Sequence, residues 1–196
     1  MKIQNLPALL LIDMQKGIAE PGYYGNERNN PNAETNARKL LDFWRAHQLP
    51  IFHIKHCSTT PSSPLVKGKV GNEFMDIVKP LESEPVFEKN VNSAFIGTDL
   101  EAVLQQQAIK KVVIVGLTTE HCISTSTRMA ANLGFETYLI ADAIATFDKV
   151  GRDGKTYAAQ LVHEIELACL HEEFATVIDA DELLEKLKTT VVKESK

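Results

Sequence analysis

The chain has 196 residues, of which 44% are hydrophobic, and its formal net charge at pH 7 is −5. This size and apolar content suit a single domain over residues 1–196 with a sizeable core, and they exclude wholesale disorder. The acidic balance argues against nucleic acid and anionic membranes as partners, because both attract basic surfaces. No apolar run approaches the roughly 20 residues that a membrane span requires.

The N-terminus and the cysteines bear on where the protein resides. The opening sequence MKIQNLPALLLIDMQ has an apolar stretch that soon meets Asp13, without the small-residue cleavage site of a signal peptide, so we interpret it as a strand. The three cysteines, Cys57, Cys122 and Cys169, are too widely spaced for a paired framework or a CxxC site. A cytoplasmic location with reduced thiols is the expectation that follows.

Short, nearly continuous apolar runs recur along the chain and are typical of strands buried on both faces of a parallel sheet. They occupy residues 8–12, 51–54, 85–87, 112–115, 137–140 and 175–178.

Segments with helical spacing of apolar residues lie between these runs. They cover residues 33–44, 98–104, 120–133, 157–169 and 183–187. Thr98 and Glu101 have the spacing of a capping box, and Gly134 stands where a helix C-cap belongs. Cys169 falls on an apolar helical stripe, so we predict that it is buried, and we predict a frayed tail after Leu187.

The alternation of strands and helices predicts an α/β fold, a Rossmann-like three-layer αβα sandwich with a mainly parallel six-stranded sheet. One connection, residues 58–84, is unusually long and rich in proline and glycine. Such a segment is a functional lid, a partner-binding loop, a disordered stretch or a plain surface loop, and the sequence leaves its role open.

In open α/β sheets, ligands bind beyond the carboxyl ends of the strands. The residues that follow the first five predicted strands are therefore the candidates for chemistry. They are Asp13, His56, Lys89, the segment 118–122 and the segment 142–147. An acid, a base and a thiol are thus predicted to meet at one edge of the sheet.

Cys122 is the sharpest candidate, because it lies in the first turn of the predicted helix after the fourth strand. A helix N-terminus favours thiolate over thiol, and a nearby Lys89 would add to this; the alternative is a small buried hydrophobe. Asp13 ends an apolar strand, where a partly dry setting raises a carboxyl pKa and suits proton exchange with a thiol. Its alternative role is a helix cap.

Three segments together resemble the isochorismatase-like, or cysteine hydrolase, superfamily over nearly the whole chain. They are ALLLIDMQ at residues 8–15, EKNVNSAFIGTDLEAVL at residues 88–104, and VIVGLTTEHCISTSTRMAANLGFETYLIADAIATF at residues 113–147. The resemblance implies a catalytic triad of Asp13, Lys89 and Cys122, in which Cys122 attacks an amide carbonyl and water then cleaves the acyl-enzyme.

The resemblance also implies a cis peptide bond, here between Leu117 and Thr118, that aims the backbone amides of Thr118 and Cys122 at the oxyanion. It further implies a small-molecule substrate and a homodimer or homotetramer. Strand-end position makes His56, Phe95, His121 and Phe147 candidate substrate-binding residues.

The resemblance bears on cofactors as well. Nicotinamidases of this superfamily carry a metal-binding Asp-x-His after the second strand, and the corresponding residues here are His56 and Ser58. Because a zinc site needs three or four converging ligands, we predict no metal and no other cofactor.

Two other functions remain open at this stage. Isochorismatases proper cleave a vinyl ether and lack the cysteine, so a cysteine-independent ether hydrolase using Asp13 is one alternative. A non-catalytic small-molecule binding module is the other, although no GxGxxG follows the first strand.

Overall fold

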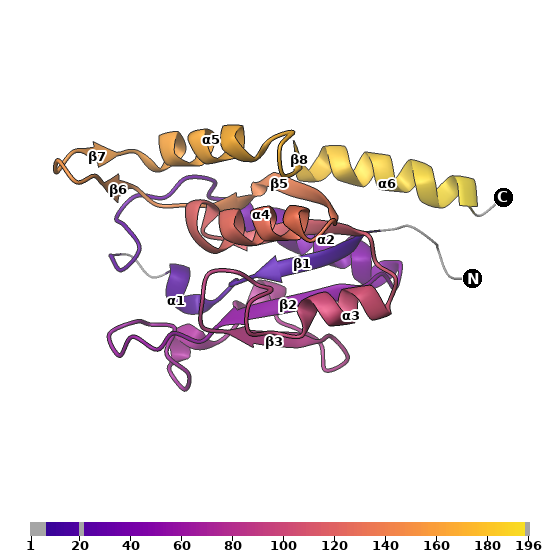
Figure 1. The fold of residues 1–196 in the computed structure, drawn as a ribbon, viewed down its shortest axis with the longest axis horizontal. Coiled ribbons are helices and arrows are strands. Elements are labelled where there is room, and N and C mark those ends of the chain that lie inside the picture. The colour runs from indigo at the N-terminus through magenta and orange to yellow at the C-terminus, as the bar shows by residue number, and fades with distance from the viewer. Residues whose placement is uncertain (1–6, 20–21, 195–196) are drawn as a thin grey trace.

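The computed structural model describes residues 7–19 and 22–194. Its centre is a six-stranded sheet in the order β3-β2-β1-β4-β5-β8, in which every neighbouring pair is parallel (Figure 1). The strands are β1 (Ala8–Ile12), β2 (Ile51–His56), β3 (Val86–Lys89), β4 (Lys111–Leu117), β5 (Glu136–Ala145) and β8 (Thr176–Ile178). Each contains most of one predicted apolar run, so the predicted α/β fold is confirmed.

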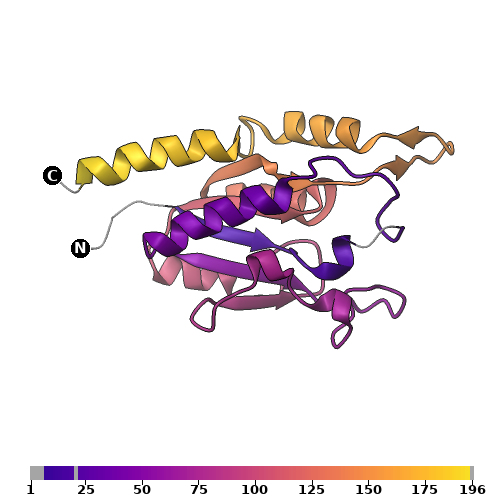
Figure 2. The same ribbon diagram turned by 180° about the vertical axis from the view of Figure 1, so that it is seen from behind.

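Helices cover both faces of the sheet (Figures 1 and 2). They are α1 (Lys16–Ala19), α2 (Ala33–Ala46), α3 (Leu100–Gln106), α4 (Ser124–Asn132), α5 (Ala159–Leu170) and α6 (Ala180–Glu194). Leu9 and Leu11 of β1 pack in one core with α2 and α6, whereas Leu10 and Ile12 pack in a second core with α3 and α4. Within the described residues, no helix is both long and apolar enough to cross a bilayer.

A small antiparallel hairpin follows β5 and was not predicted. It joins β6 (Lys149–Val150) to β7 (Thr156–Tyr157) and projects beyond the end of the sheet (Figure 1). Two-residue strands are too short to produce a hydrophobic period, which explains why the sequence pattern did not reveal them.

Three local predictions were wrong. The edge strand β3 is not buried on both faces, since Val86 is 43% exposed. The capping box does not form: α3 begins at Leu100, and the Thr98 hydroxyl instead donates to the carbonyl oxygen of Ala94 at 2.6 Å. The last helix, α6, continues past Leu187 as far as Glu194, where a frayed tail was expected.

The prediction that Cys169 is buried was also wrong. Cys169 is exposed, and so are Leu161 and Ile165 on the same side of α5. The side of α5 that faces the protein instead carries His163 and Leu170, both buried. Because α5 has apolar residues on more than one side, its stripe could not show which side packs inward.

The long connection at residues 58–84 is packed against the protein. It contains two short 3₁₀ turns, η1 (Val70–Asn72) and η2 (Asp76–Val78), and buries Leu65 and Met75. The Asn72 side chain donates to the backbone oxygens of His56 and Leu65, at 2.8 and 2.9 Å. These bonds tie the connection to the end of β2.

Candidate active site

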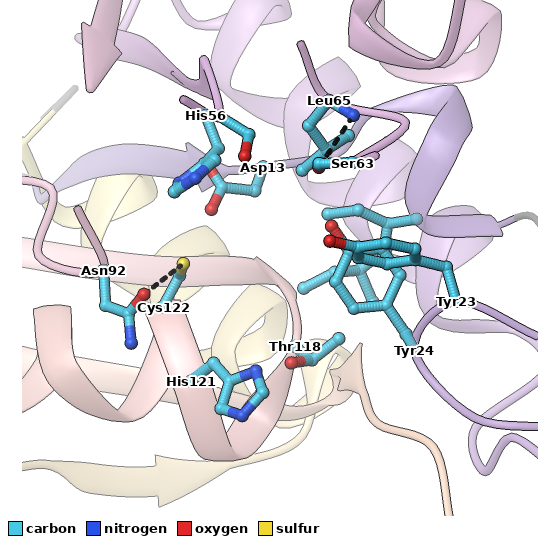
Figure 3. A pocket seen from close by; sticks show the side chains of 13 residues that line it. Asp13, Tyr23, Tyr24, His56, Ser63, Leu65, Asn92, Thr118, His121 and Cys122 are labelled. Atoms are coloured by element: carbon cyan, nitrogen blue, oxygen red, sulfur yellow. Dashed lines mark hydrogen bonds between the residues drawn. The ribbon is translucent and has the colours of Figure 1, made fainter. Parts of the chain in front are cut away.

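The candidate site lies at the carboxyl ends of β1, β2, β3 and β4. Asp13, His56 and Lys89 end or follow the first three of these strands, and Cys122 lies in η3 (Thr119–Ile123), a π-helical turn between β4 and α4. Because parallel strands end at one edge, residues as distant in sequence as Asp13 and Cys122 meet there. Figure 3 shows the Cys122 thiol and the Asp13 carboxylate facing the same space.

Lys89 is the centre of this cluster. Its Nζ lies 2.6 Å from Asp13 Oδ2, 3.2 Å from His56 Nδ1 and 3.3 Å from Cys122 Sγ. An ammonium has three N–H donors and no acceptor, so these three acceptors fit its full capacity. The structure thereby brings the three residues of the predicted triad into direct contact.

The charges in the cluster follow from burial and contact. Burial lowers the pKa of Lys89, but the charge of Asp13 and the hydrogen bonds to Asp13 and Cys122 more than offset this, and the net pKa is raised. The pKa of Cys122 is also raised, first by burial and then by the Asp13 charge, against the opposing effect of Lys89. Burial and the Asp13 charge therefore oppose the thiolate that the helix N-terminus was expected to favour.

His56 is held as a neutral imidazole. Burial, and after it the Lys89 charge, lowers its pKa. Since the ammonium can only donate, Nδ1 must accept, and the neutral ring carries its proton on Nε2. The backbone of His56 is fixed by Gln15, whose amide oxygen accepts from His56 N at 2.8 Å and whose amide nitrogen donates to His56 O at 3.0 Å.

The backbone at residues 116–118 has unusual geometry and leads into η3, the turn that contains Cys122. Gly116, beside a β-bulge between β4 and β5, has φ +132°, and a Cβ there would lie 1.9 Å from Ile12 O, so no other residue fits without displacement. One residue further along the chain, the peptide bond between Leu117 and Thr118 is cis. The Thr119 hydroxyl lies 3.0 Å from Nδ1 of the buried His163, which joins the turn to α5.

The thiol opens on a pocket of about 150 Å³. Its lining comprises Asp13, Ile18, Tyr23, Tyr24, His56, Ser58, Ser63, Leu65, Asn92, Leu117, Thr118, His121 and Cys122. Two of the four predicted substrate-binding residues, His56 and His121, are therefore in place. The long connection contributes to the wall through Ser58, Ser63 and Leu65.

The other two predicted substrate-binding residues are not in the lining. Phe95 is buried in the core and stacks on Phe135, with ring centroids 6.0 Å apart. Phe147 stacks behind Tyr24 at 6.3 Å and supports the wall from outside. Asp142, from the segment expected at the fifth strand end, lies within β5, where its Oδ1 accepts from Ala180 N at the start of α6.

Several lining residues escaped the sequence analysis. Tyr23 and Tyr24 lie in the connection between α1 and α2, which has no strand end and no periodic pattern to mark it. Asn92 lies three residues after Lys89, and its Oδ1 is 3.9 Å from Cys122 Sγ. Proximity to a candidate catalytic residue was the one signal that could have indicated Asn92.

The donor set does not fit a metal ion. Ligand atoms of Asp13, His56 and Cys122 all lie within 4.8 Å of one another. However, the Lys89 ammonium already contacts all three residues, so a divalent ion would have to sit beside a buried cation. Ser58, at the second of the two positions compared with the metal-binding motif, lines the pocket and has only a neutral hydroxyl.

Comparison with known proteins places this geometry in a family. Residues 7–182 match the isochorismatase domain. The uncharacterized isochorismatase family protein YrdC of Bacillus subtilis is 45% identical, over 93% of this chain and 96% of that protein. A crystal structure of an isochorismatase-family protein from Chromobacterium violaceum is 40% identical with a TM-score of 0.89, over 93% of this chain and 94% of the other. Nicotinamidase 3 of Arabidopsis thaliana is 27% identical, over 93% and 89%. The predicted superfamily is confirmed: the chain belongs to the isochorismatase family.

Proposed function

We propose that this protein is a cysteine amidohydrolase that cleaves a C–N bond of a small amide through an acyl-enzyme on Cys122. The observation that carries the proposal is the contact of one buried ammonium, Lys89, with both the Asp13 carboxylate and the Cys122 thiol. A carboxylate to accept a proton, a thiol to attack and a fixed positive charge are the groups that nucleophilic acyl transfer requires.

Acylation begins with proton transfer from the thiol to Asp13. Oδ1 of Asp13 is buried and has no hydrogen-bond partner within the described residues, so it is free to accept that proton. The thiolate then attacks the amide carbonyl carbon, a C–S bond forms, and the carbonyl electron pair moves to oxygen. The proposed oxyanion donors are the backbone amides of Thr118 and Cys122.

Collapse of this intermediate breaks the C–N bond. The proton held by Asp13 passes to the leaving nitrogen, so ammonia or an amine departs neutral. Water then gives a proton to Asp13 and attacks the thioester, and the return of that proton to sulfur restores the thiol. Lys89 remains protonated throughout and offsets the negative charge that moves between Asp13 and Cys122.

The family supports hydrolysis, and the names of several relatives support amide chemistry. Besides the nicotinamidase, they include an N-carbamoylsarcosine amidase of Arthrobacter, 26% identical, and a maleamate amidohydrolase of Pseudomonas putida, 30% identical. The alternative of vinyl-ether hydrolysis by Asp13 does not use the thiol. Contact between Lys89 and the thiol favours the cysteine-dependent reaction.

The test is a screen of small primary amides for ammonia release, followed by Cys122→Ala, Asp13→Asn and their double variant. Each single change is expected to lower kcat by about 10³-fold or more, and the double variant to be scarcely worse, because groups that act in one chemical step are non-additive. Cys169→Ala, at an exposed cysteine on α5, is the matched control. Near-normal turnover by folded Cys122→Ala would overturn the proposal, and turnover lost in Asp13→Asn alone would favour ether hydrolysis.

A further inference from the structure

The charges around the pocket limit what its substrate can carry. Among the thirteen lining residues none is lysine or arginine, and the one carboxylate is Asp13. The nearest cation, Lys89, has a side chain that is 0% exposed, and its three donors are directed at Asp13, His56 and Cys122. Within the described residues, the pocket therefore presents no free positive charge to a ligand.

Each of the two histidines in the lining already contacts a neighbouring charged side chain. His121 lies 3.7 Å from the Glu120 carboxylate, and Glu120 also binds Lys149 at 2.8 Å. Nδ1 of the His56 imidazole already accepts a hydrogen bond from the Lys89 ammonium at 3.2 Å. A ligand carboxylate in this pocket would lose solvent, would meet no free lysine or arginine side chain and would face Asp13.

The remaining wall combines aromatic, apolar and neutral polar groups. Tyr23 and Tyr24 contact each other edge to face, with centroids 4.9 Å apart, and Figure 3 shows them across the pocket from Asp13 and His56. Ile18, Leu65 and Leu117 add apolar surface, and Ser58, Ser63, Asn92 and Thr118 add neutral polar groups. The volume, about 150 Å³, is close to that of an engineered cavity of roughly 150 Å³ that holds one benzene.

We propose that the substrate is a small, uncharged carboxamide with an apolar acyl group of about the size of one ring, and that the pocket rejects amides bearing a carboxylate. This inference rests on the proposed function, because that function makes the substrate an amide. Its charge selectivity rests on the pocket alone, so the two can be tested separately.

The first experiment uses alkylating agents and needs no turnover. Iodoacetamide and iodoacetate have nearly the same shape and differ in charge, and Cys169, which is exposed on α5, serves as an internal control in the same chain. We expect the ratio of iodoacetamide to iodoacetate labelling at Cys122 to exceed that at Cys169 by about tenfold or more, because a buried unpaired charge is costly. Equal ratios, or a preference for iodoacetate at Cys122, would overturn the inference.

A pair of variants tests the cause of this selectivity. Ser58→Arg places a guanidinium in the lining, whereas Thr59→Arg places one on the next residue, which is exposed and outside the lining. Ser58→Arg is expected to lower the labelling ratio at Cys122 several-fold more than Thr59→Arg does. Equal effects of the two variants would show that general surface charge, and not the pocket, sets the selectivity.

The second experiment uses turnover. Butyramide, 4-aminobutyramide and succinamate have the same four-carbon acyl chain but are neutral, cationic and anionic. We expect kcat/KM for the neutral amide to exceed that for succinamate by about 100-fold. Faster Cys122-dependent cleavage of succinamate or of the cationic amide would overturn the inference and leave the proposed function intact. Absence of Cys122-dependent turnover on every amide in the wider screen, with the labelling selectivity present, would instead overturn the proposed function.

Discussion

The Lys89 ammonium and the Asp13 carboxylate form an ion pair, 2.6 Å apart, that solvent does not reach, with side chains 0% and 1% exposed. Replacing one of the two residues by a neutral one leaves the other charge buried without its partner, which strongly destabilises the folded protein. Lys89 therefore contributes to folding as well as to the proposed chemistry.

The ion pair gives a prediction about stability that is independent of activity. Lys89→Met is expected to lower the free energy of unfolding by about 3–5 kcal/mol, because Asp13 is left uncompensated. The double variant Lys89→Met/Asp13→Asn should recover part of that loss, since no charge then remains buried. Urea denaturation of the two variants measures the difference. A double variant less stable than Lys89→Met would show that the pair is not the source of the effect.

We predict that Cys122, the proposed nucleophile, reacts more slowly with an alkylating agent than the exposed Cys169 does. Cys122 is 8% exposed and its pKa is raised by burial, whereas Cys169 is exposed. Because thiolates are the species that alkylate, limited iodoacetamide should label Cys169 before Cys122 in the resting protein. In denaturant the two should label at similar rates. Faster labelling of folded Cys122 would mean that the resting site already holds a thiolate.

The surroundings of Cys122 show what a sequence can and cannot predict. The six strands and the meeting of Asp13, Lys89 and Cys122 follow from local patterns, because apolar runs mark strands and parallel strands end together. The burial that raises the pKa of Cys122 is a property of the assembled structure. The placement of Tyr23 and Tyr24 in the pocket, and of Phe95 outside it, likewise depends on packing between segments distant in the chain.

His56 is predicted to orient Lys89, and this role should be visible in the pH profile. The pKa of His56 lies below its ordinary value of 6.5, so the ring is neutral and accepts from Lys89 at neutral pH. Protonation at lower pH removes the acceptor and places a second cation beside Lys89, so kcat/KM should fall only as pH drops below 6.5. Asp13 and Cys122 also lie beside the ring, with ligand atoms of the three residues within 4.8 Å of one another, and burial raises the pKa of Cys122 away from this range.

Two variants distinguish this positioning role from a structural one. His56→Ala removes the acceptor and should lower kcat/KM by roughly 10- to 100-fold, because small misplacements at a reacting centre are costly. In His56→Asn the side-chain oxygen can replace Nδ1 without titrating, so activity should be largely restored and the acid limb should move to lower pH. If the asparagine variant were as impaired as the alanine variant, with an unchanged acid limb, His56 would not act through its acceptor nitrogen.

Gly116 connects the backbone of β4 to the position of Asp13. A Cβ at Gly116 would lie 1.9 Å from the carbonyl oxygen of Ile12, the residue that precedes Asp13, and the glycine has φ +132°. Gly116→Ala must therefore push the end of β1 away from β4, and we expect it to lower the free energy of unfolding by about 3 kcal/mol or more. Because Asp13 moves with β1, kcat/KM should fall as well.

Gly134→Ala is the matched control for Gly116→Ala. Gly134 also has positive φ, +87°, but an added Cβ there meets nothing within 4 Å. Its cost should be confined to the left-handed backbone, about 1–2 kcal/mol, with kcat/KM unchanged. Denaturation midpoints and kcat/KM for the two variants separate backbone strain from the clash with β1. If both alanine variants lost the same stability and both kept full activity, close approach of Gly116 to Ile12 would not be what sets the position of Asp13.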